Sequence, residues 1–384
     1  MYSNKKLSYG IKRLFFYFLK LGSIGFGGPV ALVGYMHRDL VGTRKWITED
    51  DYKEGLALAQ LAPGPLAAQL AIYIGYIDFG IAGATIAGLA FVLPSFLMVV
   101  ALGFAYVKFG GLPWMQAVFY GVGAAVIGII TMSGYKLTKK TIGKDWLCWV
   151  IFLGLATVTA LTENENIWLI LLSGVVVLVV RTPQLFTNTS NSVLLPFFLQ
   201  IANQVTFNER LFKIGIFFLK AGTFIFGSGL AIVPFLYGGL VKENHWLNDQ
   251  QFLDAVAVAM ITPGPVVITV GFIGYLIGGL PGACVAAFAT FLPCYLFTII
   301  PAPYFKKYGK KPGLKNFIDG VTAAAVGAIV GAVIVLGKRQ FSDLGSVAIA
   351  LAAVLVLIKL KKIPEPIIIL AAALIGLALK IIPW

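Results

Sequence analysis

The stretch FLKLGSIGFGGPVALV, from Phe18 to Val33, recurs 200 residues later as FLKAGTFIFGSGLAIV, from Phe218 to Val233. The two copies stay in register without a gap as far as the Pro-Gly-Pro elements at residues 63–65 and 263–265. Biased composition alone does not hold register over such a length. The chain is therefore predicted to consist of two homologous halves.

Beyond the Pro-Gly-Pro elements, one deleted residue changes the offset to 199, and the match continues to Gly121 and Gly320. We place the first half at residues 1–181 and the second half at residues 207–384. Residues 182–206 lie between them and begin with the polar stretch TPQLFTNTSNS. This composition predicts a linker.

Apolar residues make up 59% of the 384 residues and charged residues 12%, a balance expected in lipid rather than in water. Apolar runs that meet or approach the roughly 20 residues of a spanning helix include 81–107, 114–133, 288–302 and 318–336. About ten to twelve such segments can be drawn. Because lipid offers no partner to backbone N–H and C=O groups, the segments are predicted to be helices. The predicted fold is an all-α, polytopic membrane protein.

Lys and Arg outnumber Asp and Glu by 30 to 16, but the basic residues gather in short loops between apolar runs. This distribution orients a protein in a bilayer, so no nucleic-acid partner is expected. The basic, acid-free stretch Lys5 to Arg13 predicts a cytoplasmic N-terminus without a removable signal peptide. Trp46 and Trp246, at matched positions beside charged residues, are predicted interfacial anchors.

The basic loops suggest how the halves are oriented. Lysines at 136–144 follow the fourth apolar segment of the first half, whereas lysines at 306–315 follow the third segment of the second half. If both loops are cytoplasmic, the halves are inverted relative to each other. Inversion needs an odd number of crossings, yet six segments can be drawn in the first half; two of them, 146–161 and 167–180, are short. We favour inversion.

Each Pro-Gly-Pro element is predicted to interrupt a helix. Proline has no backbone donor and clashes with the preceding turn, so in the first half one helix stops near Leu61 and another starts near Pro65. Irregular backbone at membrane depth is tolerated only where protein buries it or where it lines an aqueous cavity. The new half-helix starts with free N–H groups and about half a positive charge. The two breaks therefore predict an anion transport site at the interface between the halves.

A glycine-rich run precedes each break, at residues 22–29 and 222–229. Glycine lets the backbone approach a ligand, although small residues in membranes also serve tight helix packing alone. Hydroxyl groups beside the glycines can donate hydrogen bonds to oxyanion oxygens. The predicted substrate-binding residues are Lys20, Ser23, Gly27, Gly28, Pro63, Gly64, Pro65, Lys220, Thr223, Gly227, Ser228, Pro263, Gly264 and Pro265.

Two lysines and two acidic residues occupy matched positions. Lys20 and Lys220 precede the glycine runs, and a lysine near the bilayer centre costs about 2.5–3.5 kcal/mol on insertion scales. They are predicted to bind substrate; the alternative is that both snorkel to water. Glu54 and Asp254 are candidates for coupling, by protonation or by pairing with lysine, and the alternative is a solvated helix face.

The sequence carries no metal or catalytic motif. Cys148, Cys284 and Cys294 lie in apolar runs without CxxC spacing. His37 and His245 are too few for a histidine metal site, and neither a Ser-His-Asp set nor an HExxH motif is found. No cofactor, metal or enzymatic activity is expected.

These motifs resemble the chromate ion transporter superfamily in its long, two-domain form. GFGGPVALVGYM (25–36), LALAQLAPGPLAAQLAIYIGY (56–76) and LAFVLPSFLMVVALG (89–103) are similar to the N-terminal domain of that family. FGSGLAIVPFL (226–236) and FLDAVAVAMITPGPVVITVGFIGY (252–275) are similar to its C-terminal domain. The resemblance covers nearly the whole chain.

What this resemblance implies is a multi-pass protein of the inner (plasma) membrane, a secondary active transporter that exports chromate and confers chromate resistance. Sulfate, an isosteric oxyanion, is then expected to compete or exchange. The residues themselves indicate only the charge of the ligand, so a sulfate or other oxyanion transporter and a channel stay open as alternatives. An enzyme acting on a lipid phosphate is a weaker alternative. The sequence leaves the coupling ion, the direction of transport and any homo-oligomer undecided.

Overall fold

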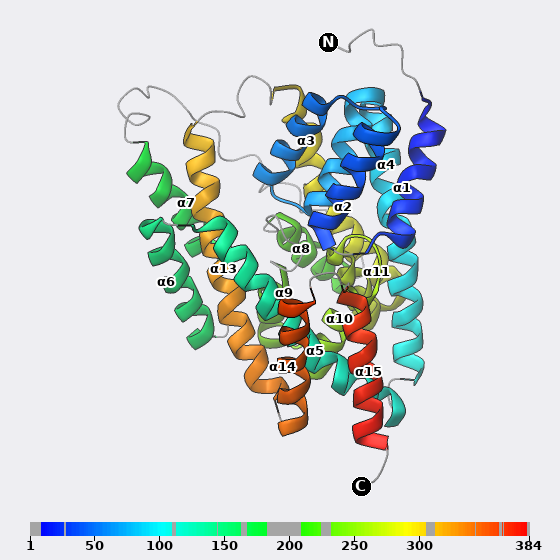
Figure 1. Cartoon of the computed structure of the whole chain (residues 1–384), viewed down its shortest axis with the longest axis vertical. Helices are drawn as coiled ribbons and strands as arrows, with labels where there is room; N and C mark the ends of the chain where they lie inside the picture. The colour runs from blue at the N-terminus through cyan, green and yellow to red at the C-terminus, as the bar shows by residue number, and fades with distance from the viewer. Residues whose placement is uncertain are drawn as a thin grey trace.

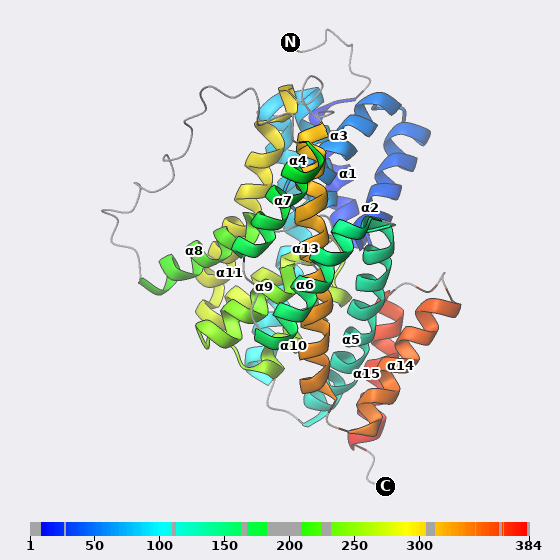
Figure 2. The ribbon, with the colours of Figure 1, turned by 90° about the vertical axis from the view of Figure 1, so that its left-hand side faces the viewer.

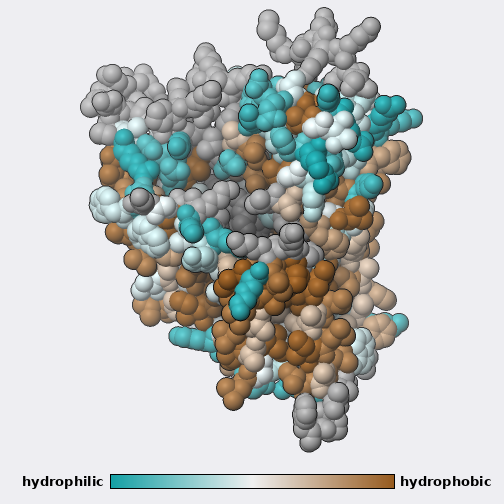
Figure 3. Space-filling view, viewed as in Figure 1, coloured by the Kyte–Doolittle hydropathy of each residue, from teal (hydrophilic) through white to brown (hydrophobic). Residues whose placement is uncertain are grey.

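A computed structural model describes residues 9–26, 28–109, 113–143, 145–162, 167–182, 209–223, 232–304, 312–341, 343–360, 363 and 365–381. Within these ranges every regular element is helical. Four helices are long and apolar enough to cross a membrane, namely Leu66–Phe109, Trp114–Lys136, Val266–Tyr304 and Lys315–Lys338. Figure 3 shows a broad apolar surface below a more polar upper end. The predicted all-α, polytopic membrane fold is confirmed.

The helices follow the order of the repeat. The first half contributes α1 (Ile11–Ile24), α2 (Gly28–Met36), η1 (His37–Thr43), α3 (Glu49–Leu61), α4 (Leu66–Phe109), α5 (Pro113–Thr141), α6 (Trp146–Thr162) and α7 (Ile167–Arg181). The second half contributes α8 (Glu209–Thr223), α9 (Val233–Tyr237), η4 (Gly238–Glu243), α10 (Asp249–Ile261), η5 (Val266–Ile268), α11 (Thr269–Ile299), α13 (Pro312–Gln340), α14 (Leu344–Lys359) and α15 (Glu365–Ile381).

Repeated sequence folds into repeated backbone around the matched tryptophans. The Trp46 N–H donates to the Leu40 carbonyl and the Trp246 N–H to the Leu240 carbonyl, both at 2.8 Å. The residue before each tryptophan has a positive φ, 52° in the first half and 51° in the second. A π-helical turn, η1 or η4, precedes each of these loops. The two halves are therefore homologous in structure as well as in sequence.

Long helices α4 and α11 each contain a break at a matched glycine. Gly80 and Gly279 both have a φ of 62°, a backbone conformation that favours glycine because no Cβ is present to clash. Each long helix thus joins two of the apolar segments that the sequence separates. This joining accounts for part of the difference between the predicted segments and the membrane-length helices, and α6, α7 and α14 are shorter apolar helices.

The halves exchange their last helix pairs. Helices α6 and α7 of the first half pack on α13 of the second half, whereas α14 and α15 of the second half pack on α5 of the first half. Figure 1 shows α6 and α7 beside α13, and α14 and α15 beside the lower part of α5. The proposed boundaries at 1–181 and 207–384 stay a prediction, but the units they delimit are interleaved in space.

Figures 1 and 2 show the relative direction of the halves. Helix α5 ascends toward the upper end of the molecule, while its counterpart α13 descends from that end. Matched helices that run in opposite directions mean that the halves are inverted, as favoured from the basic loops. Helices α3 and α10 end at buried breaks, so the number of apolar segments in a half does not equal its number of crossings.

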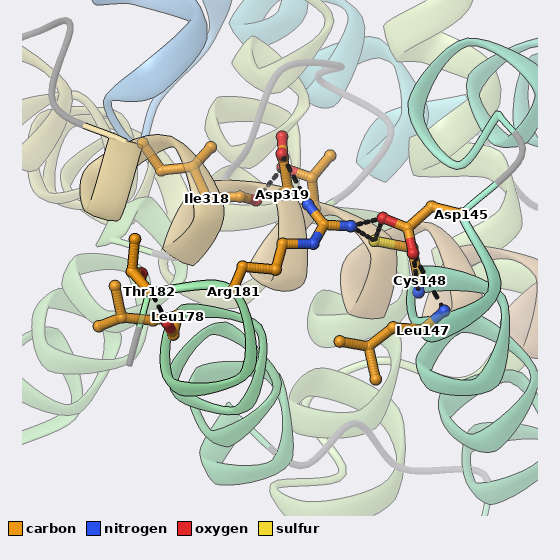
Figure 4. Close-up of polar contacts among 9 residues, drawn as sticks. Asp145, Leu147, Cys148, Leu178, Arg181, Thr182, Ile318 and Asp319 are labelled. Carbon is orange, nitrogen blue, oxygen red and sulfur yellow. Dashed lines mark hydrogen bonds and ion pairs between the residues drawn. The ribbon is translucent and has the colours of Figure 1, made fainter. Parts of the chain in front are cut away.

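A polar cluster ties the first exchanged pair to its host helix (Figure 4). Arg181, at the end of α7, contacts the carboxylate of Asp145, which precedes α6, and lies 3.4 Å from Asp319 Oδ2 on α13. Asp145 Oδ1 also accepts a hydrogen bond from the backbone N–H of Leu147 at 3.0 Å. Arg181 therefore joins both ends of the pair to the opposite half.

The second exchanged pair has a matching cluster. Lys380, the counterpart of Arg181, lies 3.3 Å from Asp343 Oδ2 and 4.5 Å from the ring centroid of Tyr120 on α5. Asp343 accepts hydrogen bonds from the Tyr120 hydroxyl and, at 2.8 Å, from the Ser346 backbone N–H. These two bonds lower the pKa of Asp343 to about 2. The carboxylate therefore stays charged across the physiological pH range.

Two matched glycines allow the exchanged pairs to approach. A Cβ at Gly121 would lie 1.9 Å from the Ala372 carbonyl oxygen, and one at Gly320 would lie 2.4 Å from the Ser173 carbonyl oxygen. Because the opposing atoms are backbone, they cannot rotate away. Alanine at either position must separate the helices.

We expect Gly121→Ala and Gly320→Ala each to destabilise the protein by about 1–3 kcal/mol, the usual cost of overpacking. Thermal unfolding of the detergent-solubilised protein, followed by size-exclusion chromatography, measures the change. The control is Gly154→Ala on α6, because a Cβ at Gly154 meets no atom within 4 Å. Equal melting temperatures for Gly121→Ala and Gly154→Ala would contradict the packing described.

Candidate functional site

Both helix breaks occur where the sequence predicts them. Helix α3 ends just before residues 62–65, and α4 begins just after them. In the second half, α10 ends just before residues 262–265, and η5 begins just after them. Gly64 and Gly264 are buried and have φ values of 144° and 89°, in the region that favours glycine. The breaks are therefore buried turns inside the fold.

The first break presents backbone donors at the start of α4. The Gln69 N–H donates to the Pro65 carbonyl at 3.0 Å and makes the first helical hydrogen bond. The N–H groups of the preceding turn, 66–68, come before that bond and carry the positive end of the helix dipole. Such a helix start favours an anion.

Gln69 also supports the turn from within. Its Nε2 donates to the Pro63 carbonyl at 2.8 Å, whereas its Oε1 is buried and finds no partner among the described residues. Because Gln69 Oε1 is a hydrogen-bond acceptor, it suits a ligand that donates a hydrogen bond rather than an anion. Four residues after Pro265, where the first half has Gln69, the second half has Thr269, so the two breaks differ chemically.

The second break lies on the glycine run of the first half. The Gly264 N–H donates to the Gly25 carbonyl at 2.9 Å, across the boundary between the halves. Ser95 Oγ lies beside this contact, 2.0 Å from the place of a Cβ at Gly264, and donates to the Gly22 carbonyl at 3.2 Å. Any side chain at position 264 would displace this arrangement.

In the same way, the first break packs against α11 of the second half. A Cβ at Gly64 would lie 3.1 Å from Cys294 Cβ. Cys294 is the counterpart of Ser95, since each follows the matched proline of α4 or α11. Each Pro-Gly-Pro element therefore packs on the same place of the opposite half. The crossed breaks place two irregular turns at the interface between the halves.

The two lysines lie away from the crossed breaks. Lys20 on α1 and Lys220 on α8 are exposed, and Lys220 lines a groove on the outer side of α8. This position agrees with the snorkelling alternative. Their part in substrate binding stays a prediction.

The other predicted site residues lie on the glycine-rich runs of the two halves. Ser23 Oγ donates to the Leu19 carbonyl and Thr223 Oγ1 to the Lys220 carbonyl, both at 2.7 Å, so each hydroxyl bonds its own helix. Gly28 begins α2. Gly27, Gly227 and Ser228 lie outside the described residues. For all of these residues a binding role stays a prediction.

The acidic candidates differ in burial. Asp254, on α10, is 3% exposed and accepts hydrogen bonds from the Tyr106 hydroxyl at 2.7 Å and from Gln250 Nε2 at 2.8 Å. Tyr106 belongs to α4, so this bond joins the halves. Glu54 is half-buried and interacts with Tyr73. Asp254 is therefore not on a solvated helix face.

Three residues near the breaks or Asp254 were not predicted as site residues from the sequence. Ser95, Tyr106 and Gln250 contact the breaks or Asp254, and no role was predicted for them. Only Ser95 had a detectable signal, because it follows a proline that the repeat aligns with Pro293. Among the described residues no group of three His, Cys, Asp or Glu side chains is placed to hold a metal ion.

Inverted, interleaved halves with two broken helices crossed at their interface are typical of secondary transporters of the inverted-repeat class. A family model described as chromate transporter matches residues 12–178 and again residues 212–377. The chain belongs to the chromate transporter family.

Curated relatives match along almost the whole chain. A chromate transport protein of Cupriavidus metallidurans is 65% identical over 375 residues, which cover 96% of this chain and 93% of that protein. A probable chromate transport protein of Synechococcus elongatus is 61% identical, covering 96% and 95% of the two chains. A chromate transport protein of Pseudomonas aeruginosa is 31% identical, covering 95% and 91%. No solved structure matches the chain.

The contact between Gly264 and Ser95 yields a prediction. Gly264→Ala is expected to destabilise the protein, because the new Cβ meets Ser95 Oγ and the positive φ costs about 1–2 kcal/mol more. Adding Ser95→Ala removes the opposing oxygen and should restore part of the loss. Melting temperatures of the two single variants and the double variant give the coupling energy.

The matched control for this cycle is Gly264→Ala combined with Ser23→Ala, since Ser23 bonds its own helix. No rescue is expected from this pair. If Ser23→Ala rescues Gly264→Ala as well as Ser95→Ala does, the contact is not the cause of the loss.

Proposed function

We propose that this protein is a secondary active transporter that exports chromate across the inner (plasma) membrane and so confers chromate resistance. Support comes from membership of the chromate transporter family and from the names of its close relatives. The observation that carries the proposal is the reciprocal crossing of the two Pro-Gly-Pro breaks at the interface between inverted halves.

The substrate is a tetrahedral dianion, which needs many donors and a positive potential. Two half-helix starts supply about one positive charge together. The first-turn N–H groups at 66–68 are the donors offered in the first half. Glycines at the crossing support this assignment, because they keep side chains away from the backbone that would face the anion. Of the two predicted lysines, Lys20 is the candidate for the remaining positive charge.

The exchanged helix pairs suggest how access alternates. Helices α6 and α7 are anchored on α13, and α14 and α15 are anchored on α5. Rocking of one half against the other therefore moves both exchanged pairs together. The crossed breaks lie at the centre of this movement. A central site between inverted halves would thus open first to one side of the membrane and then to the other.

Asp254 is the proposed coupling residue. Its burial and its bond to Tyr106 of the other half support this role, because protonation would remove the charge that holds Tyr106 and Gln250. Loss of those bonds would loosen the contact between the halves. Proton binding and the rearrangement of the interface would thus be linked. Glu54 is the second candidate.

Uptake of labelled chromate into inverted membrane vesicles tests the function. We expect saturable uptake that depends on the protein and falls when the proton gradient is collapsed. Vesicles from cells with the empty vector serve as the control. Absence of protein-dependent uptake under every condition would refute chromate export, and uptake that does not saturate would favour a channel.

Sulfate is the second candidate substrate, since it has the same charge and shape. Excess sulfate in the same vesicles is expected to reduce chromate uptake. Uptake of labelled sulfate in preference to chromate would instead assign the protein to sulfate transport.

Asp254→Asn is expected to abolish the dependence of uptake on the proton gradient, because the amide cannot take up the coupling proton. Asp50→Asn is the matched control, since Asp50 is exposed at the start of α3. Initial uptake rates with and without the gradient measure the effect. An Asp254→Asn variant that still responds fully to the gradient would exclude this residue from coupling.

A further inference from the structure

A groove of about 740 Å³ lies in the second half between α8 and η4. Figure 2 shows α8 at the outer flank of the bundle. The floor is aromatic: Phe217 stacks on Phe235 with centroids 5.3 Å apart and meets Trp246 at 5.7 Å. Phe212 and Ile216 at its edge are 46% and 39% exposed. In a membrane protein, such an outward apolar groove faces lipid.

The equivalent place in the first half is filled by the chain itself. The Tyr9 ring stacks on Trp46 with centroids 4.3 Å apart. The guanidinium carbon of Arg44 lies 4.7 Å from the ring centroid of Trp46 and 5.3 Å from that of Tyr17. An aromatic ring and a cation therefore occupy the first-half site, and the cation lies over aromatic faces that attract it.

Changes at matched positions leave the second-half site empty of these groups. Tyr9 corresponds to Glu209, and Arg44 corresponds to Asn244. The Asn244 amide donates to the Gly239 carbonyl at 2.8 Å instead of covering an aromatic ring. The second half therefore retains the aromatic floor but lacks the cation.

The backbone of η4 widens the same groove. Arg38 and Asp39, which pair with each other at 2.9 Å in the first half, correspond to Gly238 and Gly239. A Cβ at Gly239 would lie 2.1 Å from the Phe217 ring. Glycine at this position thus lets the aromatic floor lie against η4 and keeps the space above it open.

Charged groups of both signs surround the floor. Glu209 and Lys213 pair at 2.7 Å, and Lys220 and Glu243 also line the groove. The ion pairs found among the described residues include neither Lys220 nor Glu243. Two carboxylates and two ammonium groups balance, so the lining complements a ligand that carries one charge of each sign on an apolar body.

We propose that this groove binds a zwitterionic phospholipid with a primary-ammonium headgroup. The ammonium lies over Trp246 and Phe217, in the place that Arg44 takes in the first half, and pairs with Glu243. The phosphate pairs with Lys220, about one helical turn beyond Phe217 on α8. The acyl chains follow the exposed apolar edge of α8.

Trp246 supports a site for a lipid headgroup. Tryptophan is enriched at the headgroup level of a bilayer, where Trp246 is a predicted anchor. Lys220 lies three residues beyond Phe217 on α8, so the groove offers the phosphate a partner separate from the aromatic floor that would hold the ammonium.

The test uses the full-length protein in nanodiscs of phosphatidylglycerol with an increasing share of phosphatidylethanolamine. Lipid retained after transfer to detergent is counted by native mass spectrometry. We expect one retained phosphatidylethanolamine in preference to phosphatidylglycerol. Preferential retention of phosphatidylglycerol, or no retained lipid, would overturn the proposal.

The decisive variant fills the groove with the side chains of the first half. Glu209→Tyr combined with Asn244→Arg is expected to abolish retention, because the ring and guanidinium occupy the headgroup site. Asn244→Ala is the matched control; it leaves the groove open and should retain the lipid. Lys220→Gln removes the phosphate partner and should weaken retention even if the double variant does not fold. Retention equal to that of the unchanged protein in both test variants would refute the site.

Discussion

The structure depends on one constraint: an interrupted helix inside a membrane must have its free backbone groups satisfied by protein. Here the partner comes from the other half, since the Gly264 N–H donates to the Gly25 carbonyl. Lipid offers no such acceptor, and exposing the break to it would cost several kcal/mol for each unsatisfied group. Each half therefore needs the other to bury its break. The crossed arrangement is what makes two homologous halves into one protein.

Close contact between backbones requires small residues, and glycines of the two runs also pack helices within each half. Gly22 lies against the Phe91 carbonyl and Gly222 against the Thr290 carbonyl, at matched positions in the two halves. The exchanged helix pairs use glycine in the same way on α5 and α13. Helices that touch through backbone can slide or rock as units without repacking long side chains. Such an interface suits a carrier whose halves move against each other.

Duplication does not make the halves equivalent in chemistry. The second half has no glutamine equivalent to Gln69, Ser95 corresponds to Cys294, and the outer groove is filled in one half and open in the other. Buried Asp254 has a half-buried counterpart in Glu54. The scaffold is thus symmetric, whereas proton coupling and lipid contact are assigned to one half.

By itself the sequence determined the membrane setting, the duplication and the helix breaks, because hydropathy, register and proline geometry act within a few residues of chain. The glycine-rich runs were also found from the sequence, because the repeat aligns them. Only the tertiary structure decided which surfaces bury the breaks, that the last helix pairs are exchanged, and that Tyr106 reaches Asp254. The tertiary structure also decided that Lys20 is exposed, because Leu14, Phe18 and Leu21 form the buried face of α1. These contacts join residues far apart in the chain, and local pattern carries no information about which of many compatible partners packs there.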